Sequence, residues 1–89
     1  MRVSESLLVK AIDHLNNVTG NPVDTYKREN GRCAAQIGNY HLWGGNGSYS
    51  LYQIATEGGG VQDILWGKTK NELYGKIDAF LKGFREGQK

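Results

Sequence analysis

The sequence predicts a two-layer α+β domain with the order helix, three strands, helix, in which both helices cover one face of an antiparallel sheet. Near both ends of the 89-residue chain, apolar residues recur at the three- and four-residue spacing that is typical of amphipathic helices. Between them, none of the 11 basic and nine acidic residues lies from Cys33 to Thr56. This charge-free stretch indicates strands around tight turns.

The length and composition favour a single domain over residues 1–89. The net charge of +2 is too balanced to predict a polyanionic partner from charge alone. One cysteine excludes an internal disulfide and fits a reducing compartment. No apolar run is long enough for a signal peptide or a membrane span. We therefore expect a cytoplasmic protein without a membrane partner.

The first helix is expected over residues 4–18. Its apolar residues share one face and are Leu7, Leu8, Ala11, Ile12, Leu15 and Val18. Ser4 can cap the first turn because its hydroxyl accepts from a free amide, and Gly20 can end the helix in the left-handed region. His14 lies off the apolar face and is expected to be exposed.

The second helix is expected over residues 69–83, with fraying after Gly83. Thr69 and Glu72 form a capping box, in which the hydroxyl and the carboxylate each satisfy a free amide. Gly75 costs up to ~1 kcal/mol relative to alanine inside a helix, which indicates close packing at that position. The apolar face consists of Leu73, Ile77, Phe80, Leu81 and Phe84.

Three strands between the helices are expected to form an antiparallel meander. They are predicted at residues 32–43, 49–56 and 61–66. Asn46-Gly47 is the pair that type I′ hairpin turns prefer, and the glycines at 58–60 make the next turn. Gly38-Asn39 interrupts the first strand as a bulge or a two-residue turn, and we favour the bulge because the better turn follows. Asn30-Gly31 is a further hairpin signal, which leaves open a short strand at 23–27.

A two-residue turn at Asn46-Gly47 fixes how the first two strands pair. Counting outwards pairs Tyr40 with Gln53, His41 with Tyr52, Leu42 with Leu51 and Trp43 with Ser50. We assign the face with Leu42 and Leu51 to the helices, since aliphatic pairs suit a helix-packed core. The opposite face then carries His41, Trp43 and Tyr52 without a covering layer, and such an aromatic face usually marks a binding or oligomer surface.

The remaining motifs do not indicate an enzyme. Cys33 and His41 lack a third group to orient them, so a buried structural cysteine is the better interpretation. Two histidines and one cysteine do not make a zinc pattern. The glycine-rich loops do not run from a strand into a helix, as a phosphate cradle requires, and the carboxylates show no paired spacing. We predict no catalytic residue, cofactor or metal.

Lys68 and Lys70 flank the start of the second helix. Free amides and two ammonium groups there can hold a phosphate of a nucleic-acid backbone. Two solvated lysines beside a helix cap are the simpler interpretation.

Two sets of residues resemble known proteins. Residues 67–73, Gly-Lys-Thr-Lys-Asn-Glu-Leu, resemble the basic start of the second helix in the double-stranded-RNA-binding domain, a likeness of topology that does not establish a function. Residues 37–42, 47–51, 58–61 and 69–74 together are similar to small uncharacterised proteins encoded by bacteriophages and mobile elements. This similarity implies a compact cytoplasmic accessory protein of a bacterial host or prophage.

The sequence leads to two hypotheses about function. In the first, the chain is a non-enzymatic binding module for single-stranded nucleic acid. The bases would stack on Trp43, Tyr52 and His41, and the phosphates would contact Lys68, Lys70 and Arg32. In the alternative, the chain is a homo-oligomeric module that buries the same face against its own copy.

Overall fold

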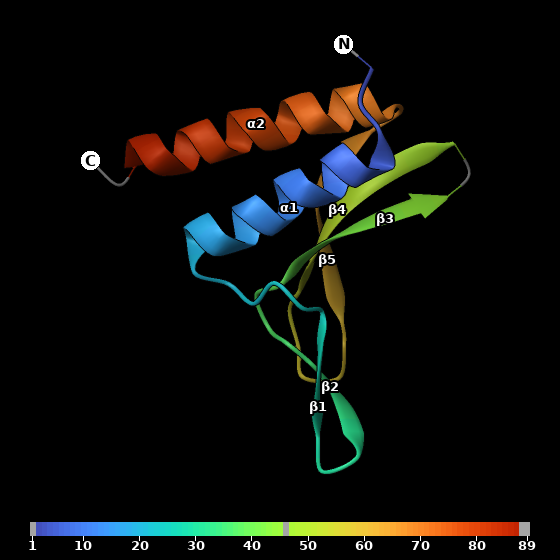
Figure 1. Cartoon of the computed structure of the whole chain (residues 1–89), viewed down its shortest axis with the longest axis vertical. Coiled ribbons are helices and arrows are strands. Elements are labelled where there is room, and N and C mark those ends of the chain that lie inside the picture. The colour runs from blue at the N-terminus through green and yellow to red at the C-terminus, as the bar shows by residue number, and fades with distance from the viewer. Residues whose placement is uncertain (1, 46, 88–89) are drawn as a thin grey trace.

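The computed structural model describes residues 2–45 and 47–87 and confirms the predicted α+β fold. Its elements are α1 (Glu5–Thr19), β1 (Tyr26–Glu29), β2 (Arg32–Ala35), β3 (Tyr40–Gly45), β4 (Ser48–Ile54), β5 (Val61–Gly67) and α2 (Lys70–Gly87). β3, β4 and β5 form one antiparallel sheet in that order, while β1 and β2 pair in a separate hairpin. Both helices lie on the same side of the three-stranded sheet (Figure 1).

The ends of α1 follow the sequence prediction. The Ser4 hydroxyl accepts a hydrogen bond from the Leu7 amide at 3.1 Å, and Gly20 ends the helix in the left-handed region with φ of 74°. His14 is exposed, as predicted. Neither helix in the described part of the chain is long and apolar enough to cross a membrane.

The ends of α2 differ from the prediction in part. The Thr69 hydroxyl accepts from the Glu72 amide at 3.1 Å, but the Glu72 carboxylate accepts from the amide of Lys68 at 3.3 Å. The helix continues to Gly87, so fraying directly after Gly83 was wrong. Close packing at Gly75 was also wrong, since a Cβ there would meet open space.

The hydrophobic core lies between the helices and the sheet. Its buried residues are Val3, Leu8, Ile12, Leu15, Tyr40, Leu51, Leu73, Ile77 and Leu81. Each fully buried leucine contributes about 1.5–3 kcal/mol relative to an exposed one. Leu51 is fully buried and pairs with Leu42, which packs against the same core. The face with Leu42 and Leu51 therefore faces the helices, as predicted.

The pairing of β3 with β4 has the predicted register, with His41 opposite Tyr52 and Trp43 opposite Ser50. Gly47 has the positive φ of 77° that the predicted hairpin turn needs. The other predicted turn residue, Asn46, lies outside the described residues.

The predicted strand at 32–43 is divided between the two sheets. A tight turn separates β2 from β3, in which the Asn39 amide donates to the Gln36 carbonyl at 3.2 Å. Gly38 occupies the third position of that turn with φ of 94°, a conformation that glycine adopts without strain. The favoured bulge at Gly38-Asn39 was therefore wrong, because the chain turns out of one sheet and into the other.

The hairpin of β1 and β2, called here the ribbon, forms around Asn30 and Gly31, whose φ angles of 51° and 77° suit a type I′ turn. This confirms a strand before that turn, although it covers Tyr26–Glu29 and not residues 23–27. Cys33 in β2 is exposed, so its predicted burial was wrong. The reason is that β2 belongs to the ribbon, which extends away from the helices (Figure 1).

Candidate binding face

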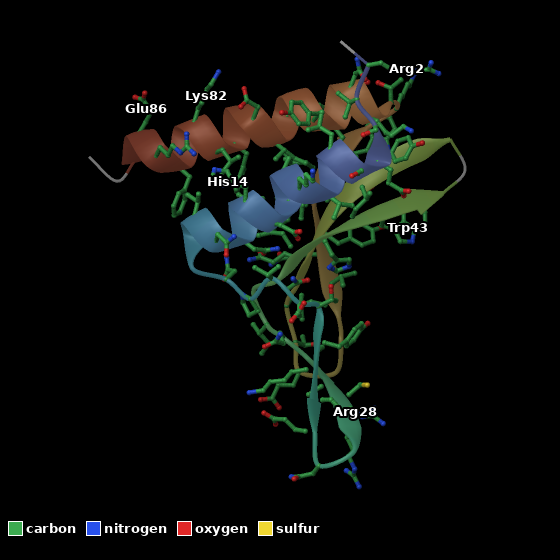
Figure 2. The ribbon with its side chains drawn as sticks, viewed as in Figure 1. Arg2, His14, Arg28, Trp43, Lys82 and Glu86 are labelled. Carbon is green, nitrogen blue, oxygen red and sulfur yellow. The ribbon has the colours of Figure 1, made fainter. Side chains whose placement is uncertain are left out.

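The side chains that point away from the helices form an open face on the three-stranded sheet. Residues paired across strands share a face, so the register places Trp43 of β3, Ser50 of β4 and Trp66 of β5 in one row. The next row contains His41, Tyr52 and Asp63. Figure 2 shows Trp43 projecting from β3 on the side away from the helices.

The two tryptophans are the most accessible aromatic groups of this face. Trp43 is 43% exposed and Trp66 is 44% exposed, whereas Ser50 between them is only 3% exposed. Strand spacing puts the two tryptophan backbones about 10 Å apart, with β4 between them. The small, buried side chain of Ser50 therefore separates two half-exposed indoles.

The aromatic rings of the open face contact one another. Trp43 stacks on Tyr52 with ring centroids 5.8 Å apart and planes inclined by 22°. His41 meets the edge of Tyr52 at 6.0 Å with an angle of 85°. Gly45 leaves room for the indole, because a Cβ there would lie 2.9 Å from the Cη2 atom of Trp43. Trp43 therefore lies between the ring of Tyr52 and the backbone of Gly45.

His41 lies at the border between the open face and α1. It lines a small pocket of about 150 Å³ together with α1 residues such as Ile12 and Asp13. Its Nδ1 atom is buried and has no hydrogen-bond partner among residues 2–45 and 47–87. Burial lowers the pKa of His41 below its ordinary value, so the ring is neutral at pH 7. A neutral ring extends the aromatic surface without adding charge.

A lysine from α2 reaches the Trp66 end of the open face. The Nζ atom of Lys76 donates to the Trp66 carbonyl at 2.5 Å and lies 5.8 Å from the centroid of its indole ring. The same ammonium is 3.5 Å from the Glu72 carboxylate. Lys76 therefore places a positive charge beside an exposed indole.

Trp66 and Lys76 were not among the predicted site residues. The pairing of β4 with β5 shifts by one residue between Leu51 and Tyr52, so the extra residue Ile64 interrupts the alternation of side chains in β5. Counting along the sequence cannot locate such a bulge. The pairing of Trp66 with Ser50 was therefore not predictable from the turn at 58–60.

The structure brings together three of the six predicted site residues. Trp43, Tyr52 and His41 form the contacts described above. Lys68 and Lys70 lie at the beginning of α2, directly after β5 along the chain. Arg32 begins β2, and the ribbon and the beginning of α2 are at opposite ends of the molecule (Figure 1). A single short ligand cannot contact Arg32 and Lys68 at once.

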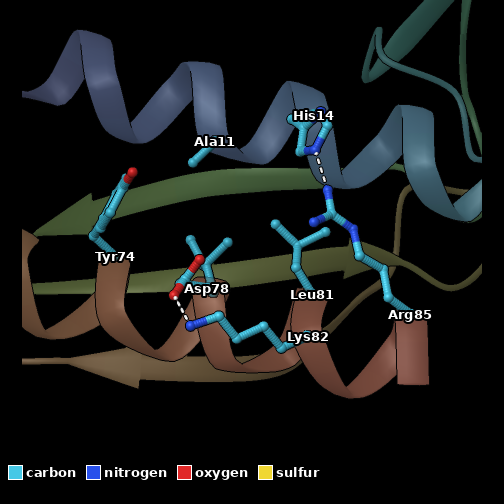
Figure 3. Close-up of a pocket in the computed structure, with 8 residues that line it drawn as sticks. Ala11, His14, Tyr74, Asp78, Leu81, Lys82 and Arg85 are labelled. Atoms are coloured by element: carbon cyan, nitrogen blue, oxygen red, sulfur yellow. Dashed lines mark hydrogen bonds and ion pairs between the residues drawn. The ribbon is translucent and has the colours of Figure 1, made fainter. Parts of the chain in front are cut away.

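A second concave region lies between the helices (Figure 3). Its polar side chains pair with one another, since Arg85 contacts the Nε2 atom of His14 at 2.9 Å and Lys82 contacts Asp78 at 3.2 Å. Its volume is about 210 Å³. In the part of the chain that the structure describes, no group of three or more His, Cys, Asp or Glu side chains could hold a metal ion.

No family model, no curated protein and no solved structure matches this chain. The two resemblances drawn from the sequence therefore stay predictions.

Proposed function

We propose that the chain is a non-enzymatic, cytoplasmic binding module whose open face binds single-stranded nucleic acid. The observation that carries the proposal is the row of Trp43, Ser50 and Trp66, which presents two half-exposed indoles on the face opposite the helices. Stacking of a base on an aromatic side chain contributes about 1–3 kcal/mol and tolerates any base, because every base has a π-face.

The charges around the open face favour a nucleic-acid strand whose backbone follows the edge of this face. Lys76 lies beside Trp66, and Lys68 and Lys70 follow Trp66 at the start of α2. Ammonium groups at this end can contact phosphates while the bases stack inwards. Asp63 lies next to Tyr52 within the face, so its carboxylate repels phosphate from the centre and favours base contacts there.

Self-association through the same face is the second candidate. Val61 of the edge strand β5 is 45% exposed and adds a further apolar side chain to the same face as Trp66, with Asp63 between the two. A second copy could bury this surface, since large exposed apolar patches often mark interfaces between proteins. Occlusion of Trp43 and Trp66 by a second copy would then compete with nucleic acid.

A fluorescence titration with an oligothymidylate tests the proposal, because both tryptophans of the chain lie on the open face. We expect stacking to quench the emission and affinity to fall as salt rises. Trp43→Ala and Trp66→Ala should each weaken binding by about 5- to 100-fold, as the loss of one stacked base predicts. Tyr26→Ala is the matched control, since Tyr26 is an exposed aromatic residue on the ribbon. Absence of binding at low salt would contradict the proposal.

A further inference from the structure

The ribbon is a two-stranded sheet with little support from the rest of the molecule. All four residues of β1 and three of the four residues of β2 are exposed. A two-stranded hairpin alone is only marginally stable in water, and a third strand or a covering layer is what usually stabilises it. Figure 2 shows Arg28 near the far end of the ribbon, away from the helices.

The hydrogen bonds of the ribbon determine which backbone groups point outwards. The Gln36 amide donates to the Thr25 carbonyl at 2.9 Å, directly beside the pair of Tyr26 and Ala35. Hydrogen-bonded and non-hydrogen-bonded pairs alternate in an antiparallel ladder. The pair of Tyr26 and Ala35 is therefore non-hydrogen-bonded, and so is the pair that contains Cys33. The N–H and C=O groups of Cys33 and Ala35 consequently face away from β1.

The two outer edges of the ribbon differ in their side chains. β1 carries Tyr26, Lys27, Arg28 and Glu29, and such bulky and charged residues hinder pairing with another strand. β2 carries Cys33, Ala34 and Ala35 after its first residue. In the three-stranded sheet, the side-chain amide of Asn16 occupies the outer backbone groups of Tyr40 on β3. The edge of β2 has no such protection within the described residues.

We propose that β2 pairs antiparallel with β2 of a second copy of this chain, across a twofold axis at Ala34. The outward residues Cys33 and Ala35 are symmetric about Ala34. Cys33 of one copy therefore pairs with Ala35 of the other, and the two residues exchange both backbone hydrogen bonds. The smallest chiral side chain of the strand lies at the axis, where two copies approach most closely. The edge of β2 is thus complementary to itself, and the ribbons of two copies make one four-stranded sheet.

Charge also favours a second copy as the partner. In this register Arg32 of one copy lies opposite Gln36 of the other, so no two like charges face each other. A groove of about 640 Å³ lies along the ribbon and is lined by residues 32–37, by Glu57, and by Lys27 and Glu29 of β1, which pair with each other at 3.3 Å. The Glu57 carboxylate therefore lines the groove that the incoming Arg32 guanidinium enters. This dimer leaves Trp43 and Trp66 on the open face free.

Light scattering of the purified chain tests the pairing. We expect a mass of twice 9.9 kDa at high concentration. Ala35→Pro should give the monomer mass, because it removes an outward N–H and leaves the bonds between β1 and β2 in place. Tyr26→Pro is the matched control. Tyr26 pairs with Ala35, so this variant also removes an outward N–H, but from the edge of β1, which the proposed dimer does not use; it should stay dimeric. A monomeric natural chain, or dimers that persist in Ala35→Pro, would overturn the proposal.

Cross-linking of Cys33 provides a second readout that does not depend on the proline variants. The proposed register places the two Cys33 Cα atoms about 9 Å apart, which is too far for a direct disulfide. A short bismaleimide should therefore join two copies efficiently. Trp43→Ala should cross-link equally well, whereas a dimer formed through the open face would lose its cross-link in this variant and refute the pairing of β2.

Discussion

The side-chain amide of Asn16 pairs with both backbone groups of Tyr40. Its Nδ2 atom donates to the Tyr40 carbonyl at 2.9 Å, and its Oδ1 atom accepts from the Tyr40 amide at 2.8 Å. Asn16 is completely buried, so this pair lies out of reach of water. The amide of one α1 residue thus takes the place of a neighbouring strand at the edge of β3, which fixes α1 against the sheet that carries the open face.

Asn16→Leu should strongly destabilise the fold. Leucine has a similar size but leaves two buried backbone groups of Tyr40 unsatisfied, and each such group costs about 1–3 kcal/mol. We expect the free energy of unfolding in urea to fall by about 2–5 kcal/mol. Asn17→Leu is the control, since Asn17 is the exposed neighbour on the same helix. Equal stability of the two variants would show that the pair with Tyr40 contributes nothing.

Gly67→Ala and Gly75→Ala should change stability in opposite directions. A Cβ at Gly67 would lie 2.7 Å from the backbone nitrogen of Leu73, so β5 and α2 would have to move apart at a cost of about 1–3 kcal/mol. A Cβ at Gly75 meets open space in the middle of α2, where alanine gains up to ~1 kcal/mol over glycine. Thermal unfolding of both variants measures the difference, and a stabilised Gly67→Ala would contradict the close contact.

Gly45→Ala should displace the indole of Trp43 with little loss of stability. The added methyl group would lie 2.9 Å from Cη2, and an exposed ring can shift where buried backbone cannot. In a Trp66→Phe background Trp43 is the one remaining tryptophan of the chain, so its emission and its quenching by acrylamide report the shift. Gly44→Ala is the control, because its Cβ would make only an ordinary contact of 3.4 Å with Tyr49. Identical spectra for the two variants would refute this packing.

His41 should make the fold less stable as the pH falls. Burial lowers its pKa in the folded state below the ordinary value of 6.5, so the unfolded chain binds the proton more readily. The free energy of unfolding should therefore decrease as the pH falls through 6.5 towards the lowered pKa. Urea titrations at several pH values should show a weaker pH dependence for His41→Gln than for the natural chain. His14→Gln, at the exposed histidine of α1, is the control.

The fold was largely predictable because its signals are local. Apolar periodicity located both helices, and one turn signal at Asn46-Gly47 gave the register of β3 and β4 and hence the face with Trp43. The division of residues 32–43 into two strands was not predictable. Gly38 can form either a bulge within one strand or a turn that ends the strand, and the sequence does not distinguish the two.

The candidate site was predictable only where it lies on that hairpin. Trp66 depends on the one-residue shift in the pairing of β5, and Lys76 depends on how α2 packs beside Trp66. Both are long-range outcomes of packing that sequence spacing does not encode. Arg32 was predicted to act with Lys68 and Lys70, but the strand predicted at 32–43 is divided and Arg32 lies on the ribbon.

A titration of an oligothymidylate at low salt, followed through the two indole N–H resonances of the labelled protein, tests most directly whether the open face binds nucleic acid. We predict that the resonances of Trp43 and Trp66 shift together and saturate together, while amide resonances on the exposed side of α1 and around Lys82 and Arg85 of α2 change little. Unchanged indole resonances at a saturating concentration of the oligonucleotide would contradict the proposed function.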